Sequence, residues 1–288
     1  MQNYVIVTDS GCDLTTDVLQ QWGVSCISLI FKFDDEAQER GSYDMPVKEF
    51  YDKMRAGGTA KTSAISIGTF QERFEEILQQ GKDVLYLGFS SGLSTTYHSA
   101  CIAADQLREQ YPQRKVLCVD TLTASAGQGL LVYLTMEKKN AGATVEEAAA
   151  FADEMKWNIN HWVTVDDLVY LKRGGRVSPT VAFVGNALGI KPTIFVDNEG
   201  HLISGAKVRG RKKALAYLAE QYAQRAKTPS EGTVFISHSD CEEDAAYVAQ
   251  LLQQHHGVQV QLTTFIGPVI GAHTGRGTVA LFFVGNGR

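Results

Sequence analysis

Hydroxyl side chains are concentrated in one short stretch of the chain, residues 87–100, which reads LGFSSGLSTTYHSA. Five of them stand between an apolar run and an amphipathic run: Ser90, Ser91, Ser94, Thr95 and Thr96. A helix that begins near Thr96 leaves its first backbone N–H groups unpaired, and these groups attract anions together with the helix dipole. The stretch therefore fits a carboxylate or a phosphate, although an ordinary helix N-cap uses the same residue types.

Two other segments repeat this composition near predicted strands. Residues 7–14 read VTDSGCDL, and residues 61–66 read KTSAIS in a predicted loop ahead of a helix. They supply further hydroxyl and carboxyl groups, at Thr8, Asp9, Ser10, Asp13, Thr62, Ser63 and Ser66. Either segment alone is typical of a turn or a helix cap. Because an open parallel sheet binds ligands beyond the carboxyl ends of its strands, three such loops at one edge predict a binding site there.

The second half of the chain offers cationic and imidazole groups in glycine-rich segments. LKRGGRVS, which starts at residue 171, places Arg173 and Arg176 around two glycines, and GPVIGAHTGRG surrounds His273 with glycines. A glycine-rich turn lets a ligand approach the backbone closely, so we expect His273 to be presented by such a turn. Arg173 either binds a carboxylate or braces the loops by hydrogen bonds, and the sequence leaves both roles open.

The hydroxyl-rich stretch also admits a different chemistry. Residues 88–92 match the G-x-S-x-G turn that carries the nucleophilic serine of many hydrolases, here Ser90, with His238 or His273 as a later base. Few strands precede Ser90 for such a fold, and residues 93–95 delay the helix that this turn would start at once. An esterase therefore stands as the alternative to a binding protein, and a binding domain for another small anion is a third hypothesis.

Composition disfavours several other classes of function. A net charge of −5, with 44% hydrophobic and 20% charged residues, fits a soluble globular protein and argues against a nucleic-acid-binding surface. HSDCEEDA, residues 238–245, looks like a metal-ligand cluster, but its acids suit the first turn of a helix, so no metal is expected. No G-x-G-x-x-G follows a strand, which disfavours a dinucleotide, and no cofactor is expected.

The N-terminus and the cysteines bear on the location of the protein. The N-terminus has no signal-peptide pattern, and the chain has no apolar run long enough to span a membrane. The five cysteines are widely spaced without a C-x-x-C pair, which favours reduced thiols. We therefore expect a cytoplasmic protein that contacts membranes at most transiently.

Strands that alternate with helices must position these residues. Strand-like apolar runs and segments of helical spacing follow one another through the first half: strands at 4–9, 24–33, 83–89 and 115–120, helices at 46–55, 68–79, 97–110 and 123–140. This alternation predicts a doubly wound parallel sheet. In the second half, two strand-like runs around residues 197–200 favour an antiparallel hairpin and hence a mixed sheet. The expected fold is α/β with two domains, 1–155 and 156–288.

Six motifs, in this order and over this length, resemble those of the DegV family of bacterial fatty-acid-binding proteins. They are VTDSGCDL, KTSAIS, SSGLSTTYHSA, LKRGGRVS, KPTI and GPVIGAHTGRG, and the resemblance covers essentially the whole chain. It implies a two-domain α/β carrier, not an enzyme, which holds a long-chain fatty acid in a tunnel between its domains. It also implies a protein partner, because several members of the family present their acyl chain to a fatty acid kinase.

The resemblance also assigns roles to individual residues. Hydroxyl groups and one imidazole would hold the carboxylate, with an arginine in support: Thr62, Ser63, Ser94, Thr95, His273 and Arg173. A head group that must be handed to a partner is better held by uncharged donors than by a buried lysine, which accounts for the hydroxyl-rich stretch. The basic stretch KVRGRKKAL supplies Arg209 and Arg211 as candidate contacts for the partner, with a solvated helix start as the plain alternative.

Some positions depart from the family pattern or are assigned only loosely. Ala64-Ile65 stands where Gln-Pro is common, Thr95 where glycine is common, and Arg276 where proline is common. Thr95 would narrow the head-group pocket or add a hydroxyl group to it, and Arg276 would add a positive charge near the head group. Candidates for the tunnel wall lie in three segments for which an ordinary core role is the plain alternative: residues 122–134, 181–190 and 193–196.

Overall fold

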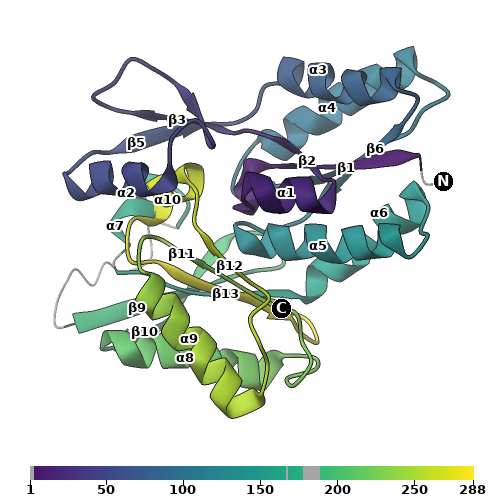
Figure 1. The fold of residues 1–288 in the computed structure, drawn as a ribbon. Coiled ribbons are helices and arrows are strands. Elements are labelled where there is room, and N and C mark those ends of the chain that lie inside the picture. The colour runs from purple at the N-terminus through teal and green to yellow at the C-terminus, as the bar shows by residue number, and fades with distance from the viewer. Residues whose placement is uncertain (1–2, 167, 178–188) are drawn as a thin grey trace.

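The N-terminal half is built on a four-stranded parallel sheet. A computed structural model describes residues 3–166, 168–177 and 189–288 (Figure 1). The strands lie in the order β2-β1-β6-β7, and every neighbouring pair is parallel, as the alternation of strands and helices predicts. Their bounds are β1 (Tyr4–Asp9), β2 (Ser25–Ile27), β6 (Asp83–Gly88) and β7 (Val116–Asp120).

Helices cover both faces of this sheet, so it is doubly wound. Val84 and Tyr86 of β6 belong to the hydrophobic cluster under α3 and α4, whereas Leu85 and Leu87 belong to the cluster under α1, α5 and α6. The strand is therefore apolar on both sides. The helix bounds are α1 (Thr16–Trp22), α3 (Ile67–Gln79), α4 (Thr96–Gln110), α5 (Ala126–Asn140) and α6 (Val145–Met155).

A small antiparallel sheet beside the first one corrects two sequence predictions. Its order is β4-β3-β5, and α2 packs against it. The single strand predicted at 24–33 is wrong: it is split because the Leu29 N–H donates to Ser10 Oγ, outside either sheet. The loop predicted at 61–66 is also wrong at its start, where Thr62 pairs with Phe31. The bounds are β3 (Ile30–Phe33), β4 (Arg40–Gly41), α2 (Val47–Arg55) and β5 (Ala60–Ser63).

The C-terminal half contains a mixed sheet of six strands in the order β10-β9-β8-β13-β11-β12. Only β11 and β12 pair in parallel, and β9 and β10 form the antiparallel hairpin that the turn residues predict. Gly200, with a φ of 77°, lies in that turn. The bounds are β8 (Ile159–Thr164), β9 (Ile190–Val196), β10 (Leu202–Arg209), β11 (Val234–His238), β12 (Leu262–Phe265) and β13 (Val279–Val284).

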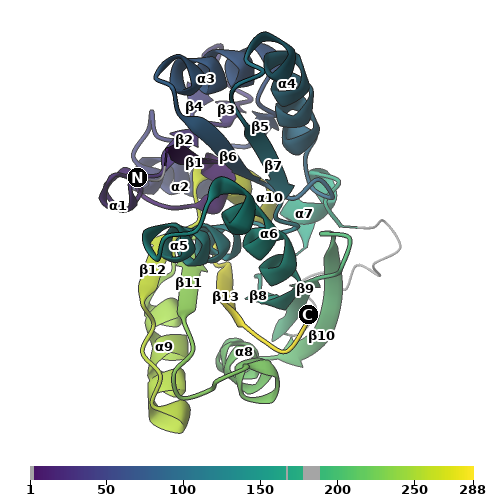
Figure 2. The ribbon, with the colours of Figure 1, turned by 90° about the vertical axis from the view of Figure 1, so that its right-hand side faces the viewer.

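The two faces of the mixed sheet meet different partners. Helices α8 (Arg211–Arg225) and α9 (Glu242–His256) cover one face, and the other is turned toward α5, which lies between the two large sheets (Figure 2). Phe235 and Phe282 of this second face share a hydrophobic cluster with Leu130 of α5. The halves thus share a core, and the domain boundary at residue 155 stays a prediction. No helix of the described residues has the length and apolar character needed to cross a membrane.

The remaining elements of the described residues are two short helices and two single 3₁₀ turns: α7 (Val169–Arg173), α10 (Pro268–Thr274), η1 (Ser10–Cys12) and η2 (Lys156–Asn158). Helix α10 comes from the C-terminal half but packs in the N-terminal core, where Val269 and Ala272 join the cluster under α3 and α4. Just before it, the Tyr51 hydroxyl donates to the Ile266 carbonyl at 2.7 Å. The position of α10 is therefore set by the N-terminal half.

Asp13 is a buried carboxyl group that also fixes the start of α10. Its Oδ1 accepts a hydrogen bond from the Gly267 N–H at 2.9 Å, and its Oδ2 lies 2.5 Å from Ser125 Oγ, which in turn contacts Ser237 Oγ at 2.8 Å. Burial raises the pKa of Asp13 to about 7, although the hydrogen bonds from Ser125 and Gly267 lower it. A group that titrates near neutral pH therefore lies where the two halves meet.

Replacing Asp13 by asparagine should remove a pH dependence of stability. An acid with a raised pKa in the folded state holds its proton more strongly there. The stabilising contribution of protonated Asp13 is complete below about pH 4, where Asp13 of the unfolded chain is protonated too. This contribution is lost as the pH rises through about 7, the pKa of Asp13 in the folded protein. Asp13→Asn cannot ionise. Relative to wild type, its free energy of unfolding in urea should therefore improve by a few kcal/mol between about pH 4 and about pH 8.

The same substitution at the exposed Asp17 of α1, Asp17→Asn, is the matched control for the loss of a carboxylate. Both variants are compared with wild type by urea unfolding across the same pH range. If the difference between Asp13→Asn and wild type stays constant over that range, Asp13 does not titrate as proposed.

Candidate ligand-binding site

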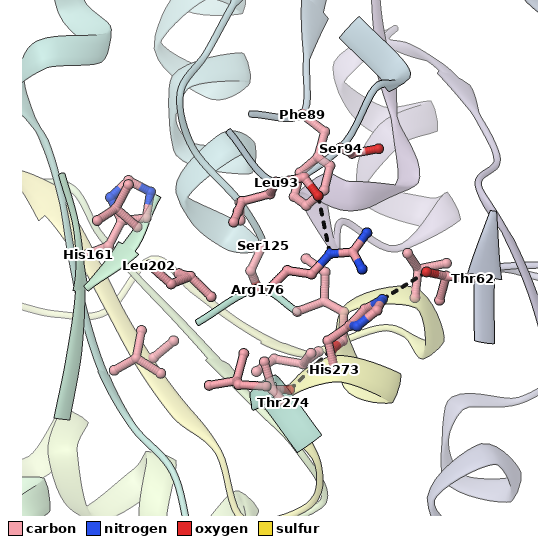
Figure 3. Close-up of a pocket in the computed structure, with 18 of the residues that line it drawn as sticks. Thr62, Phe89, Leu93, Ser94, Ser125, His161, Arg176, Leu202, His273 and Thr274 are labelled. Carbon is pink, nitrogen blue, oxygen red and sulfur yellow. Dashed lines mark hydrogen bonds between the residues drawn. The ribbon is translucent and has the colours of Figure 1, made fainter. Parts of the chain in front are cut away.

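A cavity of about 440 Å³ lies between the two halves, a size within the range of small-molecule sites. Its walls come from the face of the C-terminal sheet turned toward α5, from β5 and α10, and from the loops after β6 and β7 (Figure 3). Most of the lining is apolar, with Leu29, Phe89, Leu93, Val163, Val165, Leu171, Ile194, Val196, Leu202, Ile266, Val269, Ile270 and Phe282. Polar groups also reach it, from Thr62, Ser63, Ser91, Ser94, Thr95, Ser125, His161, Arg176, His273, Thr274 and Thr278.

The polar lining residues are not spread evenly around the cavity. Figure 3 shows Thr62, Ser94, Arg176 and His273 on one side of it, and we call these four residues the polar cluster. They come from β5, the loop after β6, the loop after α7 and α10. The other side, around Leu202, is lined mainly by apolar side chains. A ligand with one polar end and a long apolar body matches this division.

Thr62 and His273, both predicted from the sequence, meet directly although 211 residues separate them. Thr62 Oγ1 and His273 Nε2 are 2.8 Å apart. Burial, together with the nearby Arg176 guanidinium, lowers the pKa of His273 to about 4. The imidazole is therefore neutral at neutral pH, with one nitrogen that donates a hydrogen bond and one that accepts.

The prediction that a glycine-rich turn presents His273 is wrong, because this residue lies in helix α10. Pro268 at the first helical position favours the start of the helix, and Gly275, with a φ of 74°, ends it. The glycine inside the helix allows close packing instead. A Cβ at Gly271 would lie only 2.5 Å from Tyr51 Oη.

Gly174 has a steric role beside the imidazole. A Cβ atom at Gly174 would lie 2.1 Å from His273 Nδ1, much closer than van der Waals contact allows. The backbone of Gly174 has a φ of −74°, which any residue adopts, so space and not conformation requires glycine here. The next residue, Gly175, has a φ of 68° and open space around its Cα. The two glycines of LKRGGRVS therefore serve different purposes.

Arg176, rather than Arg173, is the arginine that lines the cavity. Arg173 is exposed at the end of α7, with its guanidinium 5.4 Å from the centre of the Tyr170 ring. Arg176 is half-buried: its Nε donates to the Leu93 carbonyl at 3.3 Å and its Nη1 to the Gly174 carbonyl. One charged donor thus joins the uncharged donors that the sequence predicted. The glycine pair in the sequence could have indicated this role of Arg176, because it ends α7 and turns the chain just before this residue.

Ser94 lies just before the first turn of α4. Its Oγ is 2.9 Å from Thr96 Oγ1 and accepts a hydrogen bond from the Thr96 N–H at 3.2 Å. The N-cap of α4 is Thr95, whose side chain makes no capping hydrogen bond. Ser94 therefore carries out part of the cap role and also faces the cavity. Thr95 and Ser63 line the cavity too, and both are exposed, so the polar cluster lies near solvent.

The loop after β1, predicted at the same edge, does not reach the cavity. Asp9 is buried and accepts hydrogen bonds from the Tyr86 hydroxyl at 2.6 Å and the Phe89 N–H at 2.9 Å. Thr8 donates to the Leu87 carbonyl, and Ser10 contacts Ser42 Oγ. Asp13 of this loop holds the start of α10. Ser66, from the other predicted segment, caps α3. These groups are structural, and Asp9 helps to hold Phe89, which lines the cavity.

Ser90 does not have the surroundings of a nucleophile. It is fully buried, and its hydroxyl donates to the Gly200 carbonyl at 2.9 Å. Both histidines considered as its base have other partners: His238 Nδ1 accepts from the Cys241 N–H at 3.4 Å, and His273 contacts Thr62. The arrangement lacks the hydrogen bond between nucleophile and base that such chemistry needs.

The predicted wall segments line the cavity only in part, and so do the positions that depart from the family pattern. Ala124, Ser125, Ile194 and Val196 line the cavity, whereas residues 130–132 are core, and 181–188 lie outside the described residues. Of the departures, Ala64 and Thr95 line the cavity, and Ile65 is buried in the core. Arg276 Nε lies 3.9 Å from Asp240 Oδ2, which also pairs with Arg55.

Comparisons with known proteins agree with this architecture. A DegV domain-containing protein of Clostridium perfringens is 42% identical over 287 residues, 99% of each chain. A DegV family protein from Thermus thermophilus, solved in a study of its fatty acid binding, has a TM-score of 0.88 and 29% identity over 99% of this chain and 100% of its own. A Thermotoga maritima protein, whose structure is described as revealing a fatty acid binding function, has a TM-score of 0.84 and 30% identity over 99% and 100%.

The match extends along the chain and is not limited to one motif. The sequence model of the DegV family covers residues 3–286, which include both large sheets and every residue of the polar cluster. The fold and the family implied by the six motifs are therefore confirmed. This chain belongs to the DegV family.

Proposed function

We propose that this protein binds a long-chain fatty acid in the cavity and presents its carboxylate to a fatty acid kinase. The polar cluster would hold the carboxylate, and the apolar side would enclose the chain. The observation that carries this proposal is the division of one cavity into a polar side and an apolar side, in a family with fatty-acid-binding members. Ser90, with no histidine as its hydrogen-bond partner among the described residues, supports a carrier rather than an esterase.

The tautomer of His273 decides what the polar cluster offers to a carboxylate. If Nε2 carries the proton, it donates to Thr62 Oγ1, and the Thr62 hydroxyl is free to donate to the ligand. Arg176 adds a charged donor. Its guanidinium is already oriented, because two of its nitrogens donate to the Leu93 and Gly174 carbonyls. The carboxylate would thus meet hydroxyl and guanidinium donors that the surrounding structure has placed in advance.

The acyl chain supplies most of the affinity in this proposal. Burial of about fifteen methylene groups at ~0.8 kcal/mol each gives a gross gain on the order of 12 kcal/mol, before the cost of ordering the chain. Each charge-assisted hydrogen bond to the head group adds only about 1.5–3 kcal/mol. The polar cluster therefore orients the acid, and the apolar side retains it.

The partner contact is proposed at the exposed part of the basic stretch. Arg209, at the end of β10, is exposed, as are Lys207, Lys212 and Lys213. Arg211 is not available in the same way, because its guanidinium pairs with Asp244 at 2.8 Å and is only 21% exposed. We therefore assign the docking role to Arg209 and the lysines, and a bracing role between α8 and α9 to Arg211.

Extraction of the purified protein with organic solvent, followed by mass spectrometry, tests the proposed function. A chain buried to this extent should survive purification, so we expect about one long-chain fatty acid per protein molecule. Protein that yields no acyl chain, and that also fails to bind added long-chain acids in a displacement titration, would contradict the proposal.

Gly174→Ala should weaken fatty acid binding without a large loss of stability. The new Cβ would force the His273 ring away and break its contact with Thr62, so we expect affinity to fall about tenfold, the equivalent of one hydrogen bond to a charged group. Displacement of a fluorescent fatty acid measures the affinity.

Gly175→Ala is the control, because its φ of 68° strains any side chain while open space surrounds it. It should lower the melting temperature and leave affinity nearly unchanged, and equal affinities for all three proteins would exclude this role of Gly174.

Reversal of charge at Arg209 should impair phosphorylation of the bound acid by the partner kinase. Arg209→Glu removes a contact on the exposed basic stretch, so we expect the kinase-dependent rate to fall severalfold at low salt while binding of the acid is unchanged. Arg73→Glu, an equal reversal on α3 at the opposite end of the molecule, is the control (Figure 1). Loss of acid binding and phosphorylation together, or equal rates for both variants, would rule out docking through Arg209.

A further inference from the structure

Two of the five cysteines are neighbours across α4 and β7. Cys101 lies in the second turn of α4, and Cys118 is the middle residue of β7, the edge strand of the parallel sheet. Cys118 Sγ is 4.0 Å from the Ala100 carbonyl oxygen, which belongs to the peptide unit that leads into Cys101. The two thiols also share a hydrogen bond. The pair is therefore already assembled in the folded protein.

Helix α4 is held close to β7 at this point. The Tyr97 hydroxyl donates to the Cys118 carbonyl at 3.3 Å, and Arg108 Nε donates to the Val116 carbonyl at 3.0 Å, so the helix is fixed over the strand on both sides of the pair. Three small residues of α4 are fully buried in the cluster between helix and sheet: Ala100, Ala103 and Ala104. Side chains as short as cysteine can bridge a helix and a strand that lie this close.

The surroundings of the pair make the two thiols chemically different. The hydrogen bond from the Cys118 thiol lowers the pKa of Cys101, although burial opposes it. The nearby Tyr97 hydroxyl and His98 lower this pKa too, whereas the Asp105 carboxylate raises it. The same hydrogen bond, together with burial, raises the pKa of Cys118. Because Cys101 is only half-buried, its thiolate is the group that a small oxidant meets first.

Both elements that carry the pair continue into the cavity wall. The first helical residue of α4, Thr96, donates its N–H to Ser94 Oγ, so Ser94 of the polar cluster is tied to the helix. Strand β7 ends at Asp120, and the loop after it contributes Ala124 and Ser125 to the wall. A covalent bond between α4 and β7 would therefore act on the site.

We propose that Cys101 and Cys118 are a redox-modification site, in which hydrogen peroxide converts the pair to a disulfide and the disulfide weakens binding in the cavity. The Cys101 thiolate attacks the peroxide: an S–O bond forms, the O–O bond breaks, and the leaving hydroxide takes up a proton to become water. The Cys118 thiol then attacks the sulfur of this sulfenic acid: the S–S bond forms, the S–O bond breaks, and the displaced hydroxide leaves as water with the thiol proton. Two thiols are thus oxidised, and one peroxide is reduced to two water molecules.

The new bond changes the position of the start of α4. An S–S bond is about 2.0 Å long, much shorter than a contact between two thiols, so its formation pulls α4 toward β7 and displaces Ser94. We expect affinity for stearic acid to fall about tenfold, the equivalent of one hydrogen bond to a charged group. This effect on affinity rests on the proposed function, whereas formation of the disulfide does not.

Peptide mass spectrometry of wild-type protein tests the formation of the disulfide and does not depend on the folding of a variant. Reduced protein is treated with hydrogen peroxide, free thiols are alkylated, and the digest is analysed without reduction. We expect one pair of peptides joined through Cys101 and Cys118, which dithiothreitol separates. Cys101 that remains a thiol, or that is oxidised only to sulfinic or sulfonic acid, would overturn the proposal.

Variants assign the roles of the two thiols. Cys118→Ser should stop at a sulfenic acid on Cys101, which dimedone labels, and Cys101→Ser should leave Cys118 unlabelled. The reverse pattern of labelling would contradict the assigned roles. Cys26→Ser is the matched control, because Cys26 neighbours Cys12, which is fully buried and has a pKa raised by burial. This control should form the Cys101–Cys118 disulfide as wild type does.

Titration with stearic acid tests the effect of the disulfide on binding. Wild type and Cys26→Ser should lose affinity about tenfold on oxidation and recover it with dithiothreitol, whereas Cys101→Ser should not change. If the disulfide forms but oxidised and reduced wild type bind the acid equally, the proposed control of binding is overturned. If the reduced protein binds no acid, the proposed function fails, and the effect on binding fails with it.

Discussion

Helix α10 is held in the N-terminal core by groups that are remote from it in the sequence, and the position of His273 depends on this anchorage. The Asp13 carboxylate and the Tyr51 hydroxyl bind the backbone just before the helix, and Val269 and Ala272 pack inside that core. His273 then meets Thr62 on the polar side of the cavity. Both halves of the chain therefore form the site. They share a hydrophobic core, and α10 of the C-terminal half packs in the core of the N-terminal half.

The cavity separates two kinds of interaction by position. Near solvent, a neutral imidazole, two hydroxyl groups and one guanidinium offer directional hydrogen bonds. Deeper, aliphatic side chains offer area, which stabilises an acyl chain by more than the head-group contacts do. Affinity and orientation are thus assigned to different parts of one site.

Local patterns in the sequence were sufficient for the large elements and insufficient for the finer placement of the site. The buried strands and the hairpin between β9 and β10 were predicted, because periodicity and turn composition are local signals. The resemblance of the motifs to a known family, and not periodicity, singled out Thr62, Ser94 and His273, which all line the cavity. The small sheet was missed because its short strands gain stability only from pairing with distant residues. The sequence could not show that Arg176 rather than Arg173 lines the cavity, because this depends on how the chain turns at Gly175 in the folded protein.

The most direct test of this account is a crystal structure of the protein with stearic acid. We expect the carboxylate within hydrogen-bond distance of Thr62 Oγ1 and Arg176, with the acyl chain on the apolar side of the cavity around Leu202. A carboxylate bound at His161 in the reverse orientation, or an acid bound outside the cavity, would exclude the proposed binding mode.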